Sequence, residues 1–526
     1  MEKRPSIIPA SALIGASYFL SKVLGLLKGR LLLGIYGATR AVEGTVSELD
    51  TFNAAFKIPD FIYQLLILGT VSSVFIPTFT YLRLKDSAKA WKLTNNVLNA
   101  AVLFMGGLSF FAFVFAGKIV PIIAPGFHNN PEALTLTVLQ TRILLLNPII
   151  FTLSSIASSL LNSFKKFLAY SLAPLAYNAG IIIGILFFVP RWGIIGASWG
   201  AVLGAFFHLL IQLPSVFRTG FRYKPILDLK DLELIKMAKQ AIPRIVAIGG
   251  SQINILVETA IASTLAAGSI TIFTYAQDLQ MIPLGLISLP LAIAIFAVFV
   301  ELSEPEKQAE FNMLLSKRMR LVMYLVMPCM AGLVLLRAEV VRLVYGTGKF
   351  SWTDTVLMAN TLGIMTISLF AQALIPLLTR VYYAKQNTKT PVSFSMISVA
   401  LNIVLSFSLA YLLDWGLFGL ALAFSCSSIL NMILLIWGLP KHNIKLKSDE
   451  LIISLVKIGF ATLFAAAMIQ ISKWSFNFVY ADLDTFWKVA SKTGTAILVG
   501  ALSYLLMTGL LKSRELAEIL ERWKKN

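Results

Sequence analysis

Apolar residues in this chain occur in blocks of roughly twenty, and short polar segments separate the blocks. A block of that length, coiled as a helix, crosses a hydrocarbon core about 30 Å thick. Lipid cannot satisfy backbone N–H and C=O groups, so spanning segments satisfy them internally. The 526 residues are 57% hydrophobic and only 13% charged, which is too little charge to cover a soluble surface. We therefore expect an all-α polytopic membrane protein.

The hydropathy pattern predicts about fourteen transmembrane helices, arranged as two six-helix lobes plus two extra C-terminal helices. The spans are expected at 6–36, 52–81, 94–116, 135–161, 167–189, 194–216, 241–263, 272–299, 319–337, 355–380, 393–413, 416–438, 451–472 and 489–511. The expected organisation is an N-terminal lobe at 1–217, a cytoplasmic linker at 218–240, a C-terminal lobe at 241–440, and two additional helices with a basic cytoplasmic tail at 441–526.

Two local motifs recur in the same order in both lobes. Trp192-Gly193 opens the sixth span and Trp415-Gly416 opens the twelfth. A short basic turn precedes each of them, at 164–167 and at 387–391. The recurrence predicts a six-helix unit used twice, a transporter design that places the substrate at the repeat interface.

The net charge of +19 has a distribution typical of a membrane protein. Lys and Arg lie in short loops between apolar blocks, as the positive-inside rule requires, and not on one face interleaved with stacking aromatics. We therefore expect a lipid bilayer as partner and no nucleic acid. Counting basic residues places both termini in the cytoplasm.

Enzyme motifs are missing from the sequence. The run at 346–349, Gly-Thr-Gly-Lys, lacks the upstream Gly and the Ser/Thr of a phosphate loop. The three His residues have no metal-ligand spacing, and both Cys residues fall inside apolar spans. We expect a transporter with no cofactor and no bound metal. Coupling to sodium, to protons or to the membrane potential stays open.

Charged residues at membrane depth are the candidate functional residues, because burying them is costly unless they face a hydrated cavity or a partner. The candidates for substrate binding are Lys22, Lys28 and Arg30 in the first span, Asp50 and Lys57 in the second, and Asp278 in the eighth. Asp50 and Lys57 lie seven residues apart and so share a helix face. Arg30 and Asp50 also fit a role at span ends, where side chains snorkel to the interface. Clustered cations attract anions, and a phosphate is the natural one.

Glu258 in the seventh span and Asn402 in the eleventh form a candidate coupling-ion site for sodium or protons. A carboxylate with an amide partner inside the membrane suits either ion. A purely structural pair is the alternative.

Three segments resemble the MurJ-type lipid II flippases. The run at 21–26, SKVLGL, is similar to that family's S-R-[VI]-L-G-F, and the run at 50–59, DTFNAAFKIP, is similar to its D-A-F-x-x-A-F-[KR]-[IL]-P. The run at 382–391, YYAKQNTKTP, is a further match. The resemblance implies a fold of the multidrug/oligosaccharidyl-lipid/polysaccharide exporter type in the bacterial inner membrane. It implies that cavity cations hold an undecaprenyl-diphosphate-linked peptidoglycan precursor while the lobes rock.

The chain departs from the family pattern at several charged positions. Lys22 and Lys28 stand where the family usually has Arg, and Gly29 replaces an acidic residue. Asp278 stands where a cavity Arg is usual, which reverses the sign of the charge. These departures leave two alternatives to a lipid II flippase: an exporter of another lipid-linked glycan or of drugs, and a non-transporting membrane scaffold.

Overall fold

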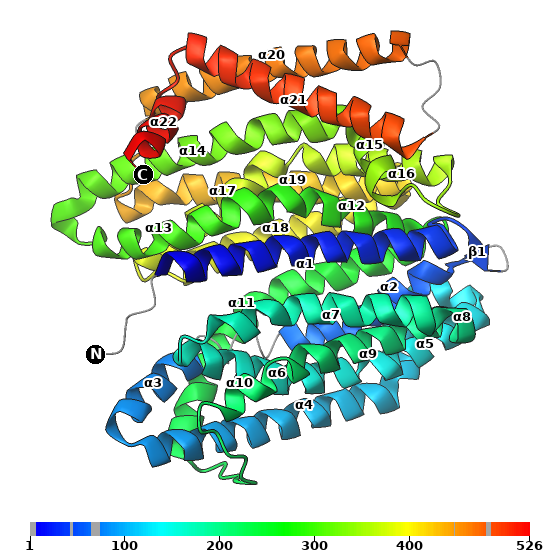
Figure 1. Cartoon of the computed structure of the whole chain (residues 1–526), viewed down its shortest axis with the longest axis vertical. Coiled ribbons are helices and arrows are strands. Elements are labelled where there is room, and N and C mark those ends of the chain that lie inside the picture. The colour runs from blue at the N-terminus through cyan, green and yellow to red at the C-terminus, as the bar shows by residue number, and fades with distance from the viewer. Residues whose placement is uncertain (1–6, 43–45, 65–73, 447, 480–484, 526) are drawn as a thin grey trace. The chain divides into compact units, whose positions relative to one another are not determined.

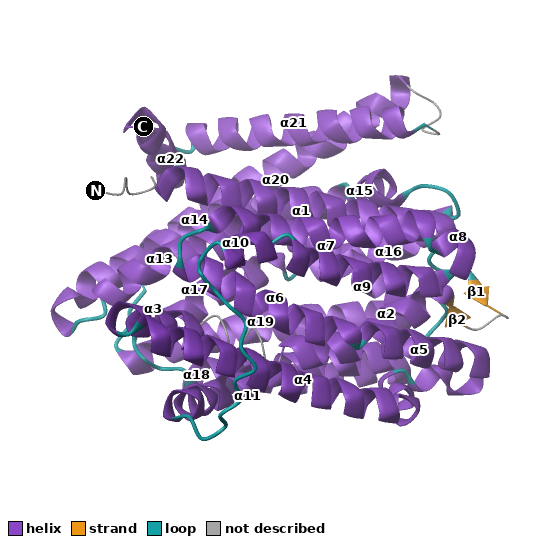
Figure 2. Cartoon of the chain, turned by 60° about the horizontal axis from the view of Figure 1, so that its bottom comes forward, coloured by secondary structure: helices purple, strands orange, loops and turns teal. Residues whose placement is uncertain are grey.

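The computed structural model describes residues 7–42, 46–64, 74–446, 448–479 and 485–525. These residues are almost entirely helical, as Figure 2 shows. Strand β1 (Ala41–Val42) pairs antiparallel with β2 (Val46–Ser47) in a short ribbon. The expected all-α fold class is confirmed.

The chain forms two compact units, coloured along the chain in Figure 1. Unit 1 comprises Met1–Thr271 and Thr347–Phe350, and unit 2 comprises Ile272–Gly346 and Ser351–Asn526. The helices of unit 1 are α1 Ile7–Tyr36, α2 Glu48–Tyr63, α3 Ile76–Lys85, α4 Ser87–Ile123, η3 Pro125–Asn129, α5 Pro131–Leu144, α6 Leu146–Ser163, α7 Phe167–Phe187, α8 Val189–Trp192, α9 Ile194–Leu210, α10 Leu213–Phe217 and α11 Leu232–Ser263.

Helix α12 (Ser269–Pro283) begins in unit 1 and continues into unit 2. The remaining helices of unit 2 are η4 Leu284–Ser288, α13 Leu289–Glu301, η5 Pro305–Lys307, α14 Gln308–Leu335, α15 Arg337–Tyr345, α16 Trp352–Thr366, α17 Leu369–Ala384, α18 Lys389–Phe407, η6 Ser408–Leu412, α19 Gly416–Gly438, η7 Leu439–His442, α20 Ser448–Val479, α21 Phe486–Leu510 and α22 Arg514–Lys525. Helix α11 belongs to unit 1, and the two compact units divide near residue 271. The predicted division into lobes, with a linker at 218–240, stays a prediction.

Among the described residues, ten helices are long and apolar enough to cross a membrane, and eleven if the bent pair α16 and α17 is one span. The polytopic architecture is confirmed, but the predicted number of fourteen is not. The other three predicted spans fall on α1 (6–36), on α2 with α3 (52–81) and on α11 (241–263). Part of the predicted span at 52–81 lies outside the described residues. Helices α1, α2 and α11 carry most of the charged residues singled out above. A charged side chain at membrane depth is typical of a helix that lines a cavity rather than one that faces lipid.

Glycines allow α7 and α9 to pack closely in unit 1. A Cβ on Gly184 would lie 2.2 Å from Cα of Gly200, and one on Gly180 would lie 2.4 Å from Cα of Gly204. Small residues four apart thus let the two backbones touch, as in other membrane helix pairs.

The recurrent motifs adopt the same local backbone in each unit. Gly193 before α9 has φ 56° and Gly416 at the start of α19 has φ 50°, a conformation that glycine adopts without steric cost. Lys165 in the first basic turn and Gln386, directly before the second, both have φ 57°. The matching turns support the repeat that the sequence predicts.

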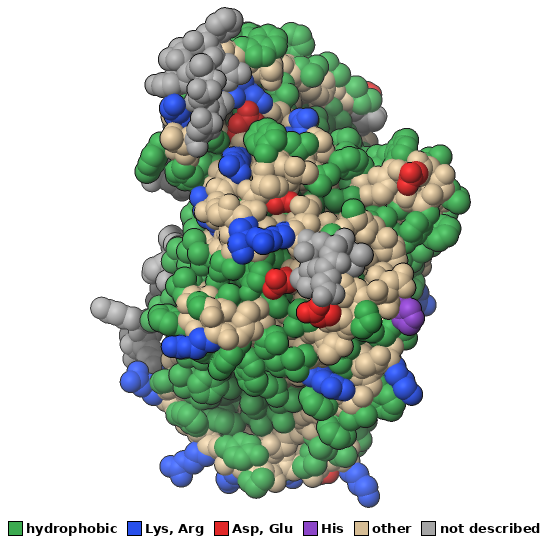
Figure 3. Space-filling view, turned by 90° about the vertical axis from the view of Figure 1, so that its right-hand side faces the viewer, with side chains coloured by type: hydrophobic (Ala, Val, Ile, Leu, Met, Phe, Trp, Pro, Cys, Tyr) green, Lys and Arg blue, Asp and Glu red, His purple; other side chains and the backbone are tan. Residues whose placement is uncertain are grey.

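Lipid-facing surfaces carry large apolar side chains. On α4, Leu103, Phe104 and Phe110 are all more than half exposed. Such an exposed apolar surface is stable only when lipid covers it. Figure 3 looks instead onto the side where helices end near β1, and there charged side chains lie between hydrophobic ones.

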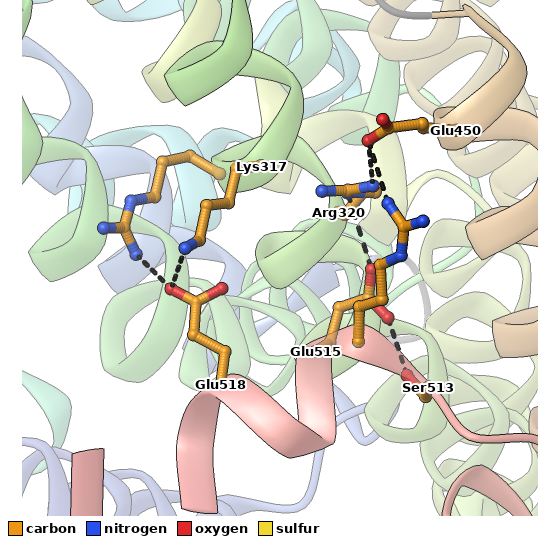
Figure 4. A network of polar contacts seen from close by, with 8 residues as sticks. Lys317, Arg320, Glu450, Ser513, Glu515 and Glu518 are labelled. Atoms are coloured by element: carbon orange, nitrogen blue, oxygen red, sulfur yellow. Dashed lines mark hydrogen bonds and ion pairs between the residues drawn. The ribbon is translucent and has the colours of Figure 1, made fainter. Parts of the chain in front are cut away.

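Charged side chains attach the C-terminal helix α22 to the rest of unit 2, as Figure 4 shows. Arg320 on α14 lies 3.1 Å from Glu450 Oε2 on α20 and 3.5 Å from Glu515 Oε1 on α22. Glu518 pairs with Lys317 at 3.2 Å and with Arg318 at 3.6 Å. Arg514 of α22 lies 3.2 Å from Glu450 Oε2, so ion pairs anchor α22 to both α14 and α20.

Candidate functional site: a cationic cluster on the first two helices

Helix α1 is fixed against α7 beside its predicted cations. The side-chain amide of Asn178 on α7 donates to the backbone oxygen of Ser21 at 3.2 Å and to its Oγ at 3.0 Å. Because Ser21 directly precedes Lys22, this contact sets the position of the stretch of α1 that carries Lys22 and Lys28.

Asp50 fixes the start of α2 to the first turn of α12. Its carboxylate is only 3% exposed and accepts three hydrogen bonds: from the Gly268 N–H at 2.6 Å, the Thr271 N–H at 2.8 Å and the Thr271 hydroxyl at 2.7 Å. A carboxylate beside the free N–H groups of a helix start satisfies them and interacts favourably with the helix dipole. Asp50 therefore positions the helix that carries Lys57. Its predicted contact with substrate stays a prediction.

Lys28 of α1 and Lys57 of α2 both interact with Asp60 of α2. Lys57 and Asp60 lie three residues apart and share a helix face, and both lysines are close enough to Asp60 for a direct charge–charge interaction. Asp60 is exposed and both lysines are half-buried. Two cations and one anion give this group, which we call the Lys28–Lys57–Asp60 cluster, a net charge of about +1 at neutral pH.

Two tyrosines of unit 1 lie beside this cluster. Tyr63 and Tyr177 both lie within electrostatic reach of Asp60. The Tyr63 hydroxyl is 3.3 Å from Ser155 Oγ, and Phe151 packs between the two tyrosine rings at 5.1 and 5.2 Å. The cluster thus has hydroxyl donors beside its charges, and these tyrosines were not among the predicted site residues. Their only sequence signal is that Tyr63 lies one turn after Asp60.

A buried histidine lies behind Phe151. His208 packs edge-on against that ring at 5.3 Å, and its Nδ1 is 2.6 Å from Ser154 Oγ. Gln212 donates to the same Ser154 oxygen at 2.8 Å and accepts from Ser158 at 2.8 Å. This network joins α6 to α9. The sequence gives no signal for this network, because its residues come from two segments that lie about fifty residues apart in the chain.

Lys22 and Arg30 take other positions on α1. Lys22 is exposed, and its Nζ lies 5.6 Å from the centre of the Tyr18 ring. Arg30 is half-buried and lies about 200° around the helix from Lys28. Convergence of these two side chains with Lys28 and Lys57 stays a prediction.

The remaining candidates are divided between the two units. Glu258 is buried in unit 1 and accepts from Asn254 Nδ2 at 2.9 Å, while Asn402 of unit 2 accepts from Ser406 Oγ at 3.3 Å. The Glu258–Asn402 pair therefore stays a prediction. Asp278 is exposed in unit 2 and lies within electrostatic reach of Tyr275. Within the described ranges, no group of three or more His, Cys, Asp or Glu side chains is arranged to hold a metal ion.

Side chains of the run at 382–391 form hydrogen bonds with neighbouring segments of unit 2. Tyr382 donates to the Leu435 carbonyl at 2.6 Å, and Asn387 lies 3.0 Å from His442 Nε2. Lys385 Nζ donates to Ser303 O and to Gln308 Oε1, each at 2.7 Å, and burial lowers the pKa of its ammonium group. These contacts account for the polar side chains of the run without a ligand.

Sequence comparison matches one family model, described as lipid II flippase MurJ, over residues 42–486. Similar proteins include a probable lipid II flippase MurJ of Buchnera aphidicola (subsp. Acyrthosiphon pisum), 26% identical over 510 residues that cover 94% of this chain and 95% of the relative. The lipid II flippase MurJ of Burkholderia cenocepacia is 24% identical over 504 residues, covering 94% of this chain and 96% of the relative.

The fold is similar to solved transporter structures. A lipid II flippase MurJ in an inward closed conformation matches with a TM-score of 0.78 at 24% identity, over 95% of this chain and 98% of that one. An inward-facing multidrug transporter of the MATE family matches with a TM-score of 0.66 at 15% identity, over 81% of this chain and 94% of that one.

Proposed function

The chain belongs to the lipid II flippase MurJ family, and from this membership we propose that it moves lipid II from the inner to the outer leaflet of the bacterial inner membrane. Lipid II is an undecaprenyl-diphosphate-linked peptidoglycan precursor. The family is one of flippases, and the proposed activity makes and breaks no covalent bond. Both termini would lie in the cytoplasm, as the distribution of Lys and Arg predicts.

The observation that carries the proposal is the accessible Lys28–Lys57–Asp60 cluster. Lysine ammonium groups bind phosphate as point charges, and a diphosphate offers several acceptor oxygens to two of them at once. Asp60 keeps the two ammonium groups together before the substrate arrives, since without an anion they would repel each other. The hydroxyl groups of Tyr63 and Tyr177 add donors beside the bound diphosphate.

Transport would follow from alternating access. The two repeat-derived lobes rock between states in which the bound headgroup faces one leaflet or the other. The polyprenyl tail stays in the bilayer throughout, because moving it into water would expose a long apolar chain. A sodium or proton gradient or the membrane potential supplies the energy, and Glu258 and Asn402 are the candidate ion-binding residues. Glu258 is buried and accepts a hydrogen bond from Asn254.

Complementation tests the proposal. Cells depleted of their own lipid II flippase and expressing this chain should grow, and Lys57→Gln and Lys28→Gln should each reduce rescue at least tenfold at equal membrane expression. Lys57→Arg, which keeps the charge, should retain most of the rescue. The matched control is Lys118→Gln, an exposed lysine at the end of α4 that lies over Phe115.

The outcomes separate the alternatives. Loss of rescue in the cluster variants alone supports a diphosphate site in unit 1. An expressed, folded wild-type chain that never rescues growth would instead favour export of another lipid-linked glycan or of drugs, or a scaffold without transport. Direct measurement of lipid II movement in vesicles decides among these, because a scaffold would move none.

A further inference from the structure

Three asparagines near the start of α4 hold an extended segment of the chain between α10 and α11. Asn95 donates to the Arg222 carbonyl at 3.2 Å and accepts from the Lys224 N–H at 2.7 Å. Asn96 donates to the Asp228 carbonyl at 2.9 Å and accepts from the Asp228 N–H at 2.7 Å. Each side-chain amide thus bonds the segment's backbone as a neighbouring strand would.

A third asparagine and two end anchors complete the attachment. Asn99 donates to Lys224 O at 3.1 Å and to Ile226 O at 2.8 Å. Phe221 is buried, with its ring 5.9 Å from that of Trp91. At the other end, Asp231 accepts from the Glu233 N–H at 2.8 Å and so caps α11. The segment 221–232, which we call the linker strand, is held along its whole length.

Side chains of the linker strand that do not face α4 form a basic and apolar surface. Leu229 is 61% exposed and Leu232 is 72% exposed, and Leu227 is exposed beside them. Tyr223 is also exposed, but its hydroxyl donates to Asn99 Oδ1 at 3.1 Å and so holds this side chain to α4. Arg222, Lys224 and Lys230 are exposed on the same segment. The acidic neighbours are engaged locally, since Asp228 Oδ1 accepts from the Lys230 N–H and Asp231 caps α11. The outward charge is therefore positive.

The attachment point on α4 marks the level of the bilayer surface. Before the asparagines, α4 exposes Lys89 and Lys92, and after them it exposes Leu103 and Phe104. Asn99 precedes Leu103 by four residues, a rise of about 6 Å along a helix. The linker strand is thus bonded to the stretch of α4 at which exposed lysines give way to exposed apolar side chains.

We propose that the linker strand is a docking surface for anionic phospholipids of the bilayer in which the protein sits. Leu227, Leu229 and Leu232 enter the boundary between headgroups and acyl chains, and Arg222, Lys224 and Lys230 bind lipid phosphates. Because the strand leads directly into α11, lipid composition sets the position of the first turn of that helix. This binding is separate from transport of a substrate.

A fluorescent label at the strand tests the proposal. In a chain with Cys329→Ala and Cys426→Ala, Leu229→Cys carries a bimane label, and the whole protein is placed in nanodiscs of phosphatidylcholine with or without phosphatidylglycerol. Quenching by shallow spin-labelled lipid should be at least twofold stronger with phosphatidylglycerol. The triple variant R222Q/K224Q/K230Q should remove that difference. The control K307Q/K441Q/K445Q, which neutralises three exposed lysines of unit 2, should keep it.

Asn96→Leu separates attachment from charge, because it keeps the three cations and removes two of the bonds that hold the strand. It should weaken lipid quenching while the thermal unfolding midpoint shows that the protein stays folded. Equal lipid quenching in both kinds of disc, or quenching mainly by aqueous iodide, would overturn the proposal. So would a label that is shielded only in native membranes, since that result points to a protein partner.

Discussion

Unit 1 and unit 2 both place charged side chains among helices, but they balance the charge differently. In unit 1, Lys28 and Lys57 share the exposed acid Asp60. In unit 2, Arg320 meets two acids, and its side chain and that of Glu515 are 10% and 5% exposed. The second acid, Glu450, is 38% exposed. Removing charge from water is costly unless a partner and hydrogen bonds compensate for it, so the buried Arg320–Glu515 pair is a structural element. The unit 1 group is open to a further anion.

A second group in unit 2 shows that accessibility, rather than net charge, distinguishes the two kinds of group. Lys473 and Lys492 both approach Glu339 Oε1, at 2.9 and 3.4 Å, so this group also has two cations and one anion. All three side chains are largely buried, and Lys473 also donates to the Leu335 carbonyl at 2.7 Å. A buried triad of this composition joins helices, whereas an exposed one can bind a ligand.

Arg320→Ala should have the largest effect on stability. It leaves Glu515 buried without its cation, and breaking a buried ion pair from one side typically costs about 3–5 kcal/mol. The measurement is the free energy of unfolding in detergent or nanodiscs. The double variant Arg320→Met with Glu515→Leu should recover much of the loss, because apolar replacement of a whole pair is often tolerated. A single variant as stable as the wild-type chain would mean that water reaches the site.

The fold could be read from the sequence because its signals are local and repeated. Blocks of roughly twenty apolar residues predict helices one at a time. The two Trp-Gly motifs predict a repeat whose turns share a backbone conformation. The span count stays unconfirmed at α1, at α2 with α3, and at α11, because parts of these predicted spans lie outside the residues and side chains that the structure describes.

The site could be predicted only in part, because pairing depends on contacts between distant segments. Lys22, Lys28 and Lys57 were expected to act together, and this stays a prediction. Lys28 and Lys57 both interact with Asp60, which was not among the predicted site residues. Asp50 was expected near substrate, which stays a prediction; its carboxylate accepts hydrogen bonds from the Gly268 N–H and from the N–H and hydroxyl of Thr271. Sequence spacing shows which residues share a helix face, but not which other helix that face meets.

Acid should weaken the Glu339 triad, a smaller effect than the loss of Arg320. Burial alone would raise the pKa of Glu339, but the hydrogen bond from Lys473 and the charges of Lys473 and Lys492 outweigh it and hold the pKa below its ordinary value of 4.5. The unfolded chain therefore takes up this proton first as the pH falls. The stabilisation is complete above about pH 4.5 and is lost as the pH drops through the folded-state pKa. Unfolding midpoints measured from pH 6 to 3 should decline less steeply for Glu339→Gln than for the wild-type chain.

Lys28→Gln should have the smallest effect on stability, because the cluster of unit 1 is accessible to solvent. Exposed ion pairs contribute about 0–1 kcal/mol, so the unfolding free energy should change by less than about 1 kcal/mol. Asp60→Asn should be similarly mild, since it leaves two lysines that water can screen. The same variants should differ in function: Lys28→Gln should impair growth rescue, while Asp60→Asn alters it through the placement of the two ammonium groups. A loss of stability in Lys28→Gln as large as that in Arg320→Ala would show that this cluster is a structural element like its counterparts in unit 2, and the contrast between the units would fail.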